Sequence, residues 1–423
     1  MRSPPDQDPS SVAGGQAGAT ATALSGQSWL APLVATLVLQ TTAAFLTRLV
    51  PTIAPALTRE IGLSPTAVGY LAAITTLGSI TFLLSGAPLI RRTGPIRALQ
   101  IGLGLGAVGV ALLWAPTIAA PIAASFLIGL GYGPSTPAGS DVLQRYAPAR
   151  HRSLIFSIKQ AGVPMGGVLA GLALPPIAEY AGWRATLVLA IVVVMFTVAA
   201  VQPLRGPIDR LRDLAQPLSF SSFLALNNLA GPMRSLRSNP GLPRIAFVGA
   251  CFAIGQGCWF AFLVTYLVAG LGLGLTAAGL VFAVMQGTGI VGRIVLGWAA
   301  DRLGSGRVTL QVVAVTSAAT SLALALSSPA WPFWALVVLA GIGGVTVSSW
   351  NGVQIAEVAR LAPRDLVAET TAGSTILIFL GYVVGPSAFA ALVSATGRFD
   401  LAFMGIAVAT LTALVALRDS TRP

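Results

Sequence analysis

The sequence predicts an all-α membrane protein with twelve transmembrane helices, arranged as two pseudo-symmetric halves of six helices each. Three observations predict this class: an apolar composition, twelve apolar runs long enough to cross a bilayer, and a repeat between the two sets of six. Of the 423 residues, 55% are hydrophobic and only 9% are charged, whereas about a quarter of the residues in a soluble domain are charged. Because a soluble fold cannot cover that much apolar surface with charge, lipid is the expected solvent.

The apolar runs divide the chain into segments, since a membrane helix needs about 20 mostly apolar residues. The twelve predicted spans cover residues 29–57, 66–90, 96–115, 118–141, 153–178, 184–202, 244–270, 276–300, 307–328, 331–357, 368–394 and 400–417. They define an N-terminal half at 28–202, a polar linker at 203–243 and a C-terminal half at 244–417. Residues 1–27, rich in Ser, Gly, Ala and Pro, are expected to form a disordered tail, and 418–423 a short second tail.

The orientation follows from the arginines and lysines between the spans, which are enriched on the cytoplasmic side of membrane proteins. If both termini are cytoplasmic, 18 of the 25 basic residues fall in the cytoplasmic connections and the C-terminal tail, and only Arg59, Arg184 and Arg398 fall in periplasmic connections. We therefore expect both termini in the cytoplasm and the bacterial inner membrane as the location. The net charge of +12 indicates no nucleic-acid binding, because the basic residues do not cluster on a soluble domain.

An internal repeat relates the two halves. A shift of 210 residues places Gly69 on Gly279 and Arg92 on Arg302, with no gap between the two matches. Six-span repeats in the same orientation imply two halves related by an axis along the membrane normal. Such an arrangement places a substrate site at the interface of the halves.

The loop after span 8 carries the most specific motif of the chain. It reads Gly297-Trp-Ala-Ala-Asp301-Arg302-Leu-Gly304-Ser-Gly-Arg307, and it resembles the signature loop of the major facilitator superfamily. In overall pattern the chain is closest to the organic-anion and cyanate/nitrate-type branches of that family. The resemblance covers residues 29–417 and implies a secondary transporter that works by alternating access.

The resemblance also implies a gating latch at the cytoplasmic face. Asp301 would face the positive N-terminus of span 11, and Arg302 would pair with Glu357 at the end of span 10. In the loop after span 2 an arginine replaces the signature aspartate, so the matching pair of Arg92 and Asp141 is expected to be weaker. The alternative is that these charges only set the membrane orientation.

Glycines spaced four apart mark spans 5 and 11, where Gly162 and Gly166 match Gly381 and Gly385. Such a stripe lets two helices touch backbone to backbone. The family resemblance implies that spans 5 and 11 pack against spans 8 and 2 across the interface of the halves. The pattern predicts helix packing and leaves open whether the glycines also serve the sliding of the halves.

Three cations lie inside predicted spans: Arg48, Arg293 and Lys159, the only lysine of the chain. None of the 13 carboxylates lies at mid-membrane, and an unpaired charge there costs a few kcal/mol or more. A bound anion would supply the missing charge, since the fork of arginine suits carboxylate and phosphate. We therefore predict a substrate site with Arg48 and Arg293 as anion ligands and Lys159 as the third partner. The alternative for Lys159 is snorkelling to the membrane surface.

Polar and aromatic residues in the same spans are further candidates for substrate contact. These candidates are Gln40, Gln160, Gln256, Gln286, Trp350, Asn351 and Gln354. The alternative for each is a hydrogen bond between helices.

The expected function is secondary transport of a small anion, a mono- or dicarboxylate or a similar ion. The sequence carries no Walker loop or zinc motif, so we expect no catalytic residue, enzyme activity, cofactor or metal. A coupling proton, a counter-anion, the direction of transport and the substrate stay open, and we expect a monomer in contact with lipid. Two alternatives remain: a proton-coupled drug or metabolite exporter, and a non-transporting membrane receptor or scaffold.

Overall fold

The computed structural model describes residues 29–218, 227–364 and 366–418. The expected tail at 1–27 lies outside these residues, as does most of the second tail. Every regular element of the described chain is a helix. The first set is α2 (Leu30–Ile61), α3 (Ala67–Ser85), α4 (Ala87–Thr93), α5 (Pro95–Leu112), α6 (Ala119–Tyr132), α7 (Ser135–Tyr146), α8 (Arg152–Gln160), α9 (Gly162–Ala181) and α10 (Trp183–Ile208).

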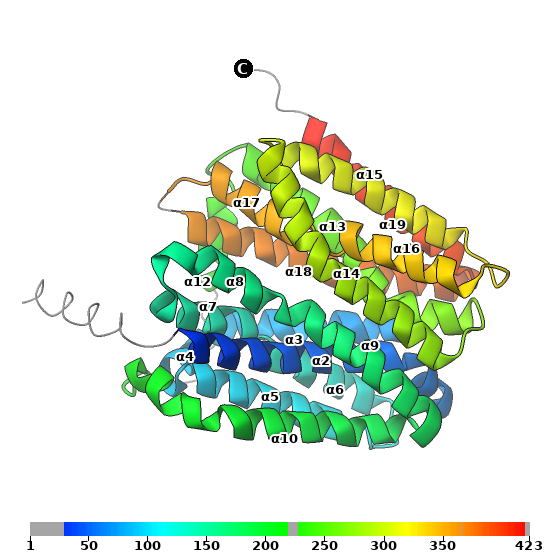
Figure 1. Cartoon of the computed structure of the whole chain (residues 1–423), viewed down its shortest axis with the longest axis horizontal. Helices are drawn as coiled ribbons and strands as arrows, with labels where there is room; N and C mark the ends of the chain where they lie inside the picture. The colour runs from blue at the N-terminus through cyan, green and yellow to red at the C-terminus, as the bar shows by residue number, and fades with distance from the viewer. Residues whose placement is uncertain (1–28, 219–226, 365, 419–423) are drawn as a thin grey trace, which may run out of the picture.

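The linker and the second set complete the fold. They comprise α12 (Asn227–Ser235), α13 (Gly241–Ala269), α14 (Leu275–Arg302), α15 (Gly306–Ala325), α16 (Phe333–Thr346), α17 (Asn351–Leu361), α18 (Val367–Thr396) and α19 (Phe399–Arg418). Figure 1 shows α2 to α10 gathered in one part of the bundle and α13 to α19 in the other. The sequence-based prediction of an all-helical membrane fold is confirmed.

Eleven helical stretches of the described chain are long and apolar enough to cross a membrane. The remaining predicted span, 118–141, is divided into α6 and α7 at Gly133 and Pro134, so neither piece reaches that length alone. The fourth span of the second set is also interrupted, between α16 and α17, but its two pieces together count as one of the eleven stretches. Proline lacks the amide hydrogen that would continue the helix, which explains the first break.

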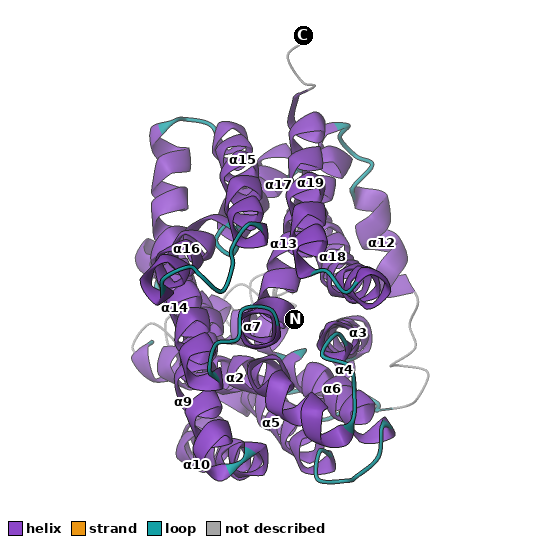
Figure 2. Cartoon of the chain, turned by 90° about the vertical axis from the view of Figure 1, so that its right-hand side faces the viewer, coloured by secondary structure: helices purple, strands orange, loops and turns teal. Residues whose placement is uncertain are grey.

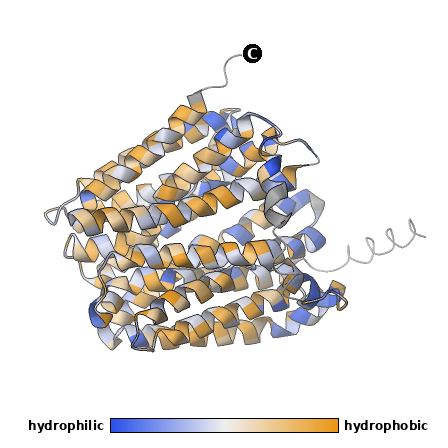
Figure 3. Cartoon of the chain, turned by 180° about the vertical axis from the view of Figure 1, so that it is seen from behind, coloured by the Kyte–Doolittle hydropathy of each residue, from blue (hydrophilic) through white to orange (hydrophobic). Residues whose placement is uncertain are grey.

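The outer surface of the bundle suits lipid. Large apolar side chains such as Phe196, Ile294 and Met195 are 75%, 70% and 66% exposed. Figure 3 shows hydrophobic residues along the lengths of the helices and hydrophilic ones gathered toward their ends. An exposed apolar belt of this kind is expected where acyl chains replace water.

The glycine stripes pack helices within each set. A Cβ on Gly166 would strike the backbone of α2 at Thr41, and one on Gly381 would lie 2.5 Å from the carbonyl oxygen of Ala250 in α13. Between the sets, α9 packs along α14 and α3 along α18, as the resemblance implied. Asp301 lies near the end of α14, which is span 8, and α14 packs on α9, which belongs to span 5. The neighbour expected for Asp301 is therefore span 5 and not span 11.

The linker is attached to both sets of helices. Asp209, fully buried directly after α10, accepts hydrogen bonds from the backbone amides of Ile96 (2.9 Å) and Arg97 (3.0 Å) at the start of α5. At the other side of the linker α12 packs on α18. We call the end of the bundle where these segments lie the linker end (Figure 1).

The two sets of helices contact each other in the middle of the bundle and at the end opposite the linker. Thr66 and Ser394 share a hydrogen bond of 2.8 Å between their hydroxyl oxygens. Glu179 accepts bonds from the amide and the hydroxyl of Thr276, at 2.8 Å and 2.6 Å. These contacts join the two sets of helices at the opposite end.

Candidate functional site

Two arginines from different sets of helices form the centre of the candidate site. Arg48 projects from α2 and Arg293 from α14; each is half-buried, and the Nε atom of each is buried with no hydrogen-bond partner among the described residues. The two guanidinium groups interact electrostatically with each other. Neither belongs to any of the ion pairs found in the described chain. Two unpaired like charges inside a membrane fold form a site that attracts an anion.

Aromatic side chains surround this arginine pair. The guanidinium carbon of Arg48 lies 4.3 Å from the centroid of the Phe260 ring in α13. Tyr132, at the end of α6, and Tyr382, in α18, interact electrostatically with both arginines. The sequence analysis did not select these three aromatic residues. Their only sequence signal is an aromatic residue inside a span or beside a helix break, a pattern that lipid-facing residues share.

Polar candidates of the second set meet at Tyr382. The Tyr382 hydroxyl donates to Oε1 of Gln256 at 2.8 Å and also bonds to the side chain of Asn351. Nε2 of Gln256 donates to the carbonyl oxygen of Ser348, 3.4 Å away, in the break between α16 and α17. The structure thus brings Gln256 and Asn351 to the arginine pair through Tyr382.

Two other candidates, Gln354 and Trp350, make contacts within the packed helices. Nε2 of Gln354 donates to the carbonyl of Ile245 (3.1 Å) and to the hydroxyl of Ser374 (2.9 Å). The Trp350 ring lies against Phe252, with 5.4 Å between ring centroids. These contacts are of the helix-to-helix kind that the sequence analysis left as the alternative.

Gln286 lies where the two sets of helices meet. Its side chain is 1% exposed, and it occupies the space beside Gly167 of α9, where a Cβ would lie 2.5 Å from its amide carbon. Gln286 therefore fills the contact between α9 and α14.

Lys159 has a separate environment at the helix breaks. Its ammonium donates to the carbonyl oxygen of Ser135 at 2.9 Å, and the side chain is 1% exposed. It covers Gly139 of α7, where a Cβ would lie 2.6 Å from its Cε atom. Gln160 receives a hydrogen bond from Gln40 at 3.1 Å and lies 3.5 Å from the ammonium. The recorded contacts of Lys159 include neither arginine of the pair.

The predicted latch residues have other partners in this structure. In the second set Glu357 pairs with Arg360 at 2.7 Å, and the Arg302 guanidinium carbon lies 6.0 Å from the Trp298 ring centroid. The Glu357 side chain fills the space beside Gly306 at the start of α15. Its position there resembles that of Asp209 at the start of α5.

In the first set Asp141 pairs with Arg145 at 2.6 Å, and Arg92 donates to the carbonyl of Gln216 at 2.8 Å. Asp301 is exposed at the linker end. The charge pairs expected from the family pattern are therefore not formed in this arrangement of the helices.

Comparison with known proteins shows the family. The chain matches the family model described as Major Facilitator Superfamily over residues 34–372, so it belongs to this superfamily of membrane transporters. The sequence analysis expected membership of this superfamily, and the match confirms it.

Curated relatives include transporters of aromatic acids. The chain is 24% identical over 398 residues to a gentisate transporter of Corynebacterium glutamicum, covering 86% of this chain and 82% of the relative. It is 24% identical over 281 residues to the 4-hydroxybenzoate transporter PcaK of Pseudomonas aeruginosa, covering 60% and 62%. It is 25% identical to an uncharacterized MFS-type transporter of Mycobacterium tuberculosis, covering 70% and 63%. The match thus spans less than two thirds of the length of several relatives.

Solved structures share the fold. A POT family transporter in complex with 5-aminolevulinic acid aligns with a TM-score of 0.72 at 13% identity, covering 90% of this chain and 94% of that one. The nucleoside transporter NupG aligns with a TM-score of 0.72 at 12% identity, covering 92% and 100%. At these identities the likeness concerns the fold alone.

Proposed function

We propose that this protein transports a small organic anion, with an aromatic carboxylate as the first candidate, and that Arg48 and Arg293 bind the carboxylate. The observation that carries the proposal is the pair of half-buried guanidinium groups, each with a buried Nε atom and without a carboxylate partner in the described chain. Relatives named as transporters of 4-hydroxybenzoate, gallate and gentisate support an aromatic acid. Phe260 offers a flat apolar surface beside Arg48 for such a ring.

Charge compensation gives this site a role in alternating access. Arg48 lies in the first set of helices and Arg293 in the second, and two like charges repel each other. A carboxylate held between them would replace that repulsion with attraction and draw the two sets together. Binding would therefore favour a state in which the linker end closes, because a ligand shifts a conformational equilibrium by its differential affinity.

The linker end is proposed to face the cytoplasm of a bacterial cell. The excess of arginine in the connections at that end supports this orientation. The recorded contacts between the sets lie toward the opposite end. In this orientation the structure represents a state closed toward the periplasm.

We propose a gating role for the latch residues and a positioning role for Lys159. Arg302 would take Glu357 from Arg360, and Arg92 would take Asp141 from Arg145, when the linker end closes. Lys159 would hold α8 against α7 through the Ser135 carbonyl and so position Gln160 and Gln40. It would act on the site through these neighbours, whereas the sequence analysis placed it on the substrate.

The test is counterflow of labelled 4-hydroxybenzoate into proteoliposomes that contain the purified protein. We expect uptake that unlabelled gentisate competes for and that neutral phenol does not. Arg48→Ala and Arg293→Ala should each abolish uptake, whereas Arg59→Ala, at an exposed arginine outside the site, should retain it. Competition by lipophilic cations or neutral solutes, with the two site variants still active, would favour the exporter alternative.

A further inference from the structure

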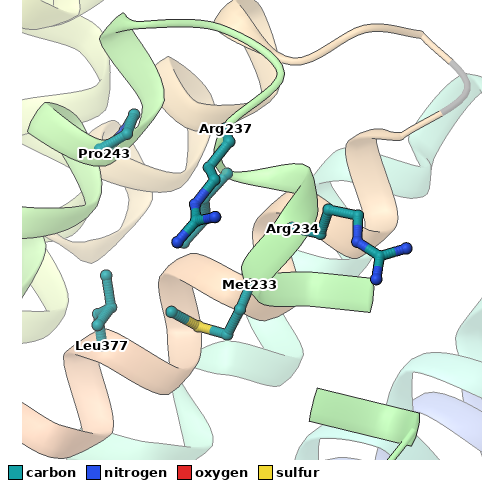
Figure 4. Close-up of a pocket in the computed structure, with 6 residues that line it drawn as sticks. Met233, Arg234, Arg237, Pro243 and Leu377 are labelled. Atoms are coloured by element: carbon teal, nitrogen blue, oxygen red, sulfur yellow. The ribbon is translucent and has the colours of Figure 1, made fainter. Parts of the chain in front are cut away.

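A cavity of about 350 Å³ lies at the linker end, between α12, the start of α13 and α18. The residues that line it are Met233, Arg234, Leu236, Arg237, Pro243 and Leu377. Figure 4 shows the Arg237 side chain pointing into this space between Pro243 and Leu377, whereas Arg234 points away from it. The described chain offers no ion pair or side-chain hydrogen bond to Arg237. The cavity therefore combines apolar walls with one inward-pointing cation.

The cavity is built into the packing of the linker helix. A Cβ on Gly373 of α18 would lie 3.0 Å from the Leu236 side chain, so the absence of that atom lets α12 approach α18 closely. Leu236 is 4% exposed and belongs to the same apolar core as Leu242 of α13. The position of α12, and with it that of Arg237, is thus fixed by a buried contact.

Below the cavity an exposed apolar strip continues toward the middle of the bundle. Phe247 lies one turn beyond Pro243 in α13, and Leu380 and Val384 lie one and two turns beyond Leu377 in α18. They are 49%, 45% and 55% exposed. By helix spacing, the strip continues along α13 and α18 from the cavity-lining residues Pro243 and Leu377.

The strip faces away from the substrate site. Phe247 precedes Gln256 by nine residues, which is about two and a half turns of helix and places the two on opposite sides of α13. Leu380 precedes Tyr382 by two residues, a rotation of about 200°. Since Gln256 and Tyr382 lie at the arginine pair, the strip faces the surrounding bilayer.

We propose that this cavity binds an anionic phospholipid, with the phosphate on Arg237 and one acyl chain along Phe247, Leu380 and Val384. The planar guanidinium fork matches phosphate geometry, and basic pockets between helices at a membrane surface are known places for anionic head groups. A free phosphate ion would use the arginine alone. A phospholipid also covers the apolar strip that begins at the cavity.

The proposal assigns the lipid a position that joins the linker to the second set of helices. Its phosphate would be held by α12 and its acyl chain by α13 and α18. A bound lipid would therefore stabilise the attachment of the linker, because a ligand that binds only the folded state raises its stability by mass action.

Thermal unfolding of the full-length protein in detergent, with added dioleoyl phosphatidylglycerol, tests the proposal. We expect phosphatidylglycerol to raise the melting temperature above the value measured with the same concentration of phosphatidylcholine. The Arg237→Gln variant should need at least ten times more phosphatidylglycerol for the same rise in melting temperature. Arg210→Gln, which removes an exposed arginine of the linker that does not line the cavity, is the control and should respond as the unmodified protein does. An equal response in Arg237→Gln, or equal stabilisation by phosphatidylcholine, would overturn the proposal.

Two further measurements distinguish a phospholipid from a free phosphate ion and test the contribution of the apolar strip. Inorganic phosphate at the same concentration should not stabilise the protein; if it reproduces the whole effect, the site binds the ion and not a lipid. Native mass spectrometry should show one retained phosphatidylglycerol, lost in Arg237→Gln and reduced in Leu380→Gln. Retention of the lipid in both variants would contradict the assignment, even if a variant were less stable.

Discussion

The guanidinium of Arg48 in α2 stacks on the ring of Phe260 in α13, with 4.3 Å from its carbon to the ring centroid. The two residues belong to different sets of helices, so this contact crosses their interface at mid-depth. Stacking on an aromatic face leaves the N–H groups at the edge of the guanidinium free to bind an anion. Phe260 thus holds the plane of the Arg48 guanidinium, as the proposed binding of a carboxylate between Arg48 and Arg293 requires.

The shape of the charge at residue 48 should matter as much as its sign. Arg48→Lys keeps the cation but replaces two parallel donors with a single ammonium. Loss of a charge-assisted hydrogen bond costs about 1.5–3 kcal/mol, so we expect the affinity for 4-hydroxybenzoate to fall about tenfold or more. Thermal stabilisation by the ligand, titrated with each purified variant, measures this change.

Arg59→Lys is the matched control for this prediction. Arg59 lies near the end of the same helix and is exposed, so its replacement should leave the titration unchanged. Unaltered affinity in Arg48→Lys would eliminate the two-bond role of Arg48, and a loss in both variants would indicate a general effect on α2.

Much of this arrangement is predictable from the sequence because lipid imposes long apolar runs, and charges inside such runs are conspicuous. Arg48, Arg293 and Lys159 are selected on that ground alone. Tyr132 is not predictable in the same way, since its role depends on the break between α6 and α7 and on which helices meet there. The neighbours of Lys159 depend equally on a tertiary contact, the Ser135 carbonyl, that no spacing in the sequence encodes.

Lys159→Met separates a positioning role from substrate binding. Methionine keeps most of the volume of the buried side chain and removes the ammonium that donates to the Ser135 carbonyl. We expect the equilibrium affinity for the substrate to change less than threefold, because the recorded contacts of Lys159 do not include the arginine pair. The transport rate should fall, since the contact between α7 and α8 is weakened.

Affinity and counterflow rate, measured on the same preparation of Lys159→Met, test this separation. Lys159→Arg keeps a donor for the carbonyl and should recover part of the rate. A loss of affinity as large as that in Arg48→Lys would instead place Lys159 on the substrate.

A disulfide at the end opposite the linker should stop transport. The hydroxyl oxygens of Thr66 and Ser394 are 2.8 Å apart, close enough that cysteines at both positions can approach the sulfur–sulfur bond length of about 2.05 Å with a small adjustment. Oxidation of Thr66→Cys/Ser394→Cys would lock the two sets of helices together at this end, and a reductant should restore counterflow. Cys251 and Cys258 are buried, so they should not compete for the bond.

Each single cysteine variant should keep its transport under the same oxidant. Full counterflow in the oxidised double variant, with the disulfide verified by mass spectrometry, would show that this end does not need to open.

Substitution by alanine should have opposite effects on stability at Gly166, where α9 closely approaches α2, and at Gly104, which lies in open space in α5. A Cβ on Gly166 would lie 2.6 Å from the backbone nitrogen of Phe45, whereas nothing lies within 4 Å of one on Gly104. Gly166→Ala must separate two backbones and should destabilise the protein by about 1–3 kcal/mol. Gly104→Ala adds a better helix former in open space and should be neutral or stabilising by up to about 1 kcal/mol.

Melting temperatures of the two alanine variants in one detergent give the comparison. A lower melting temperature in Gly166→Ala only, with transport unchanged per folded molecule, would indicate packing as its role. If Gly166→Ala melts as the unmodified protein does but transports more slowly, the stripe serves the movement between α2 and α9. Because α2 and α9 belong to the same set of helices, such a movement would occur within the first half and would differ from the sliding of the two halves that the sequence analysis left open.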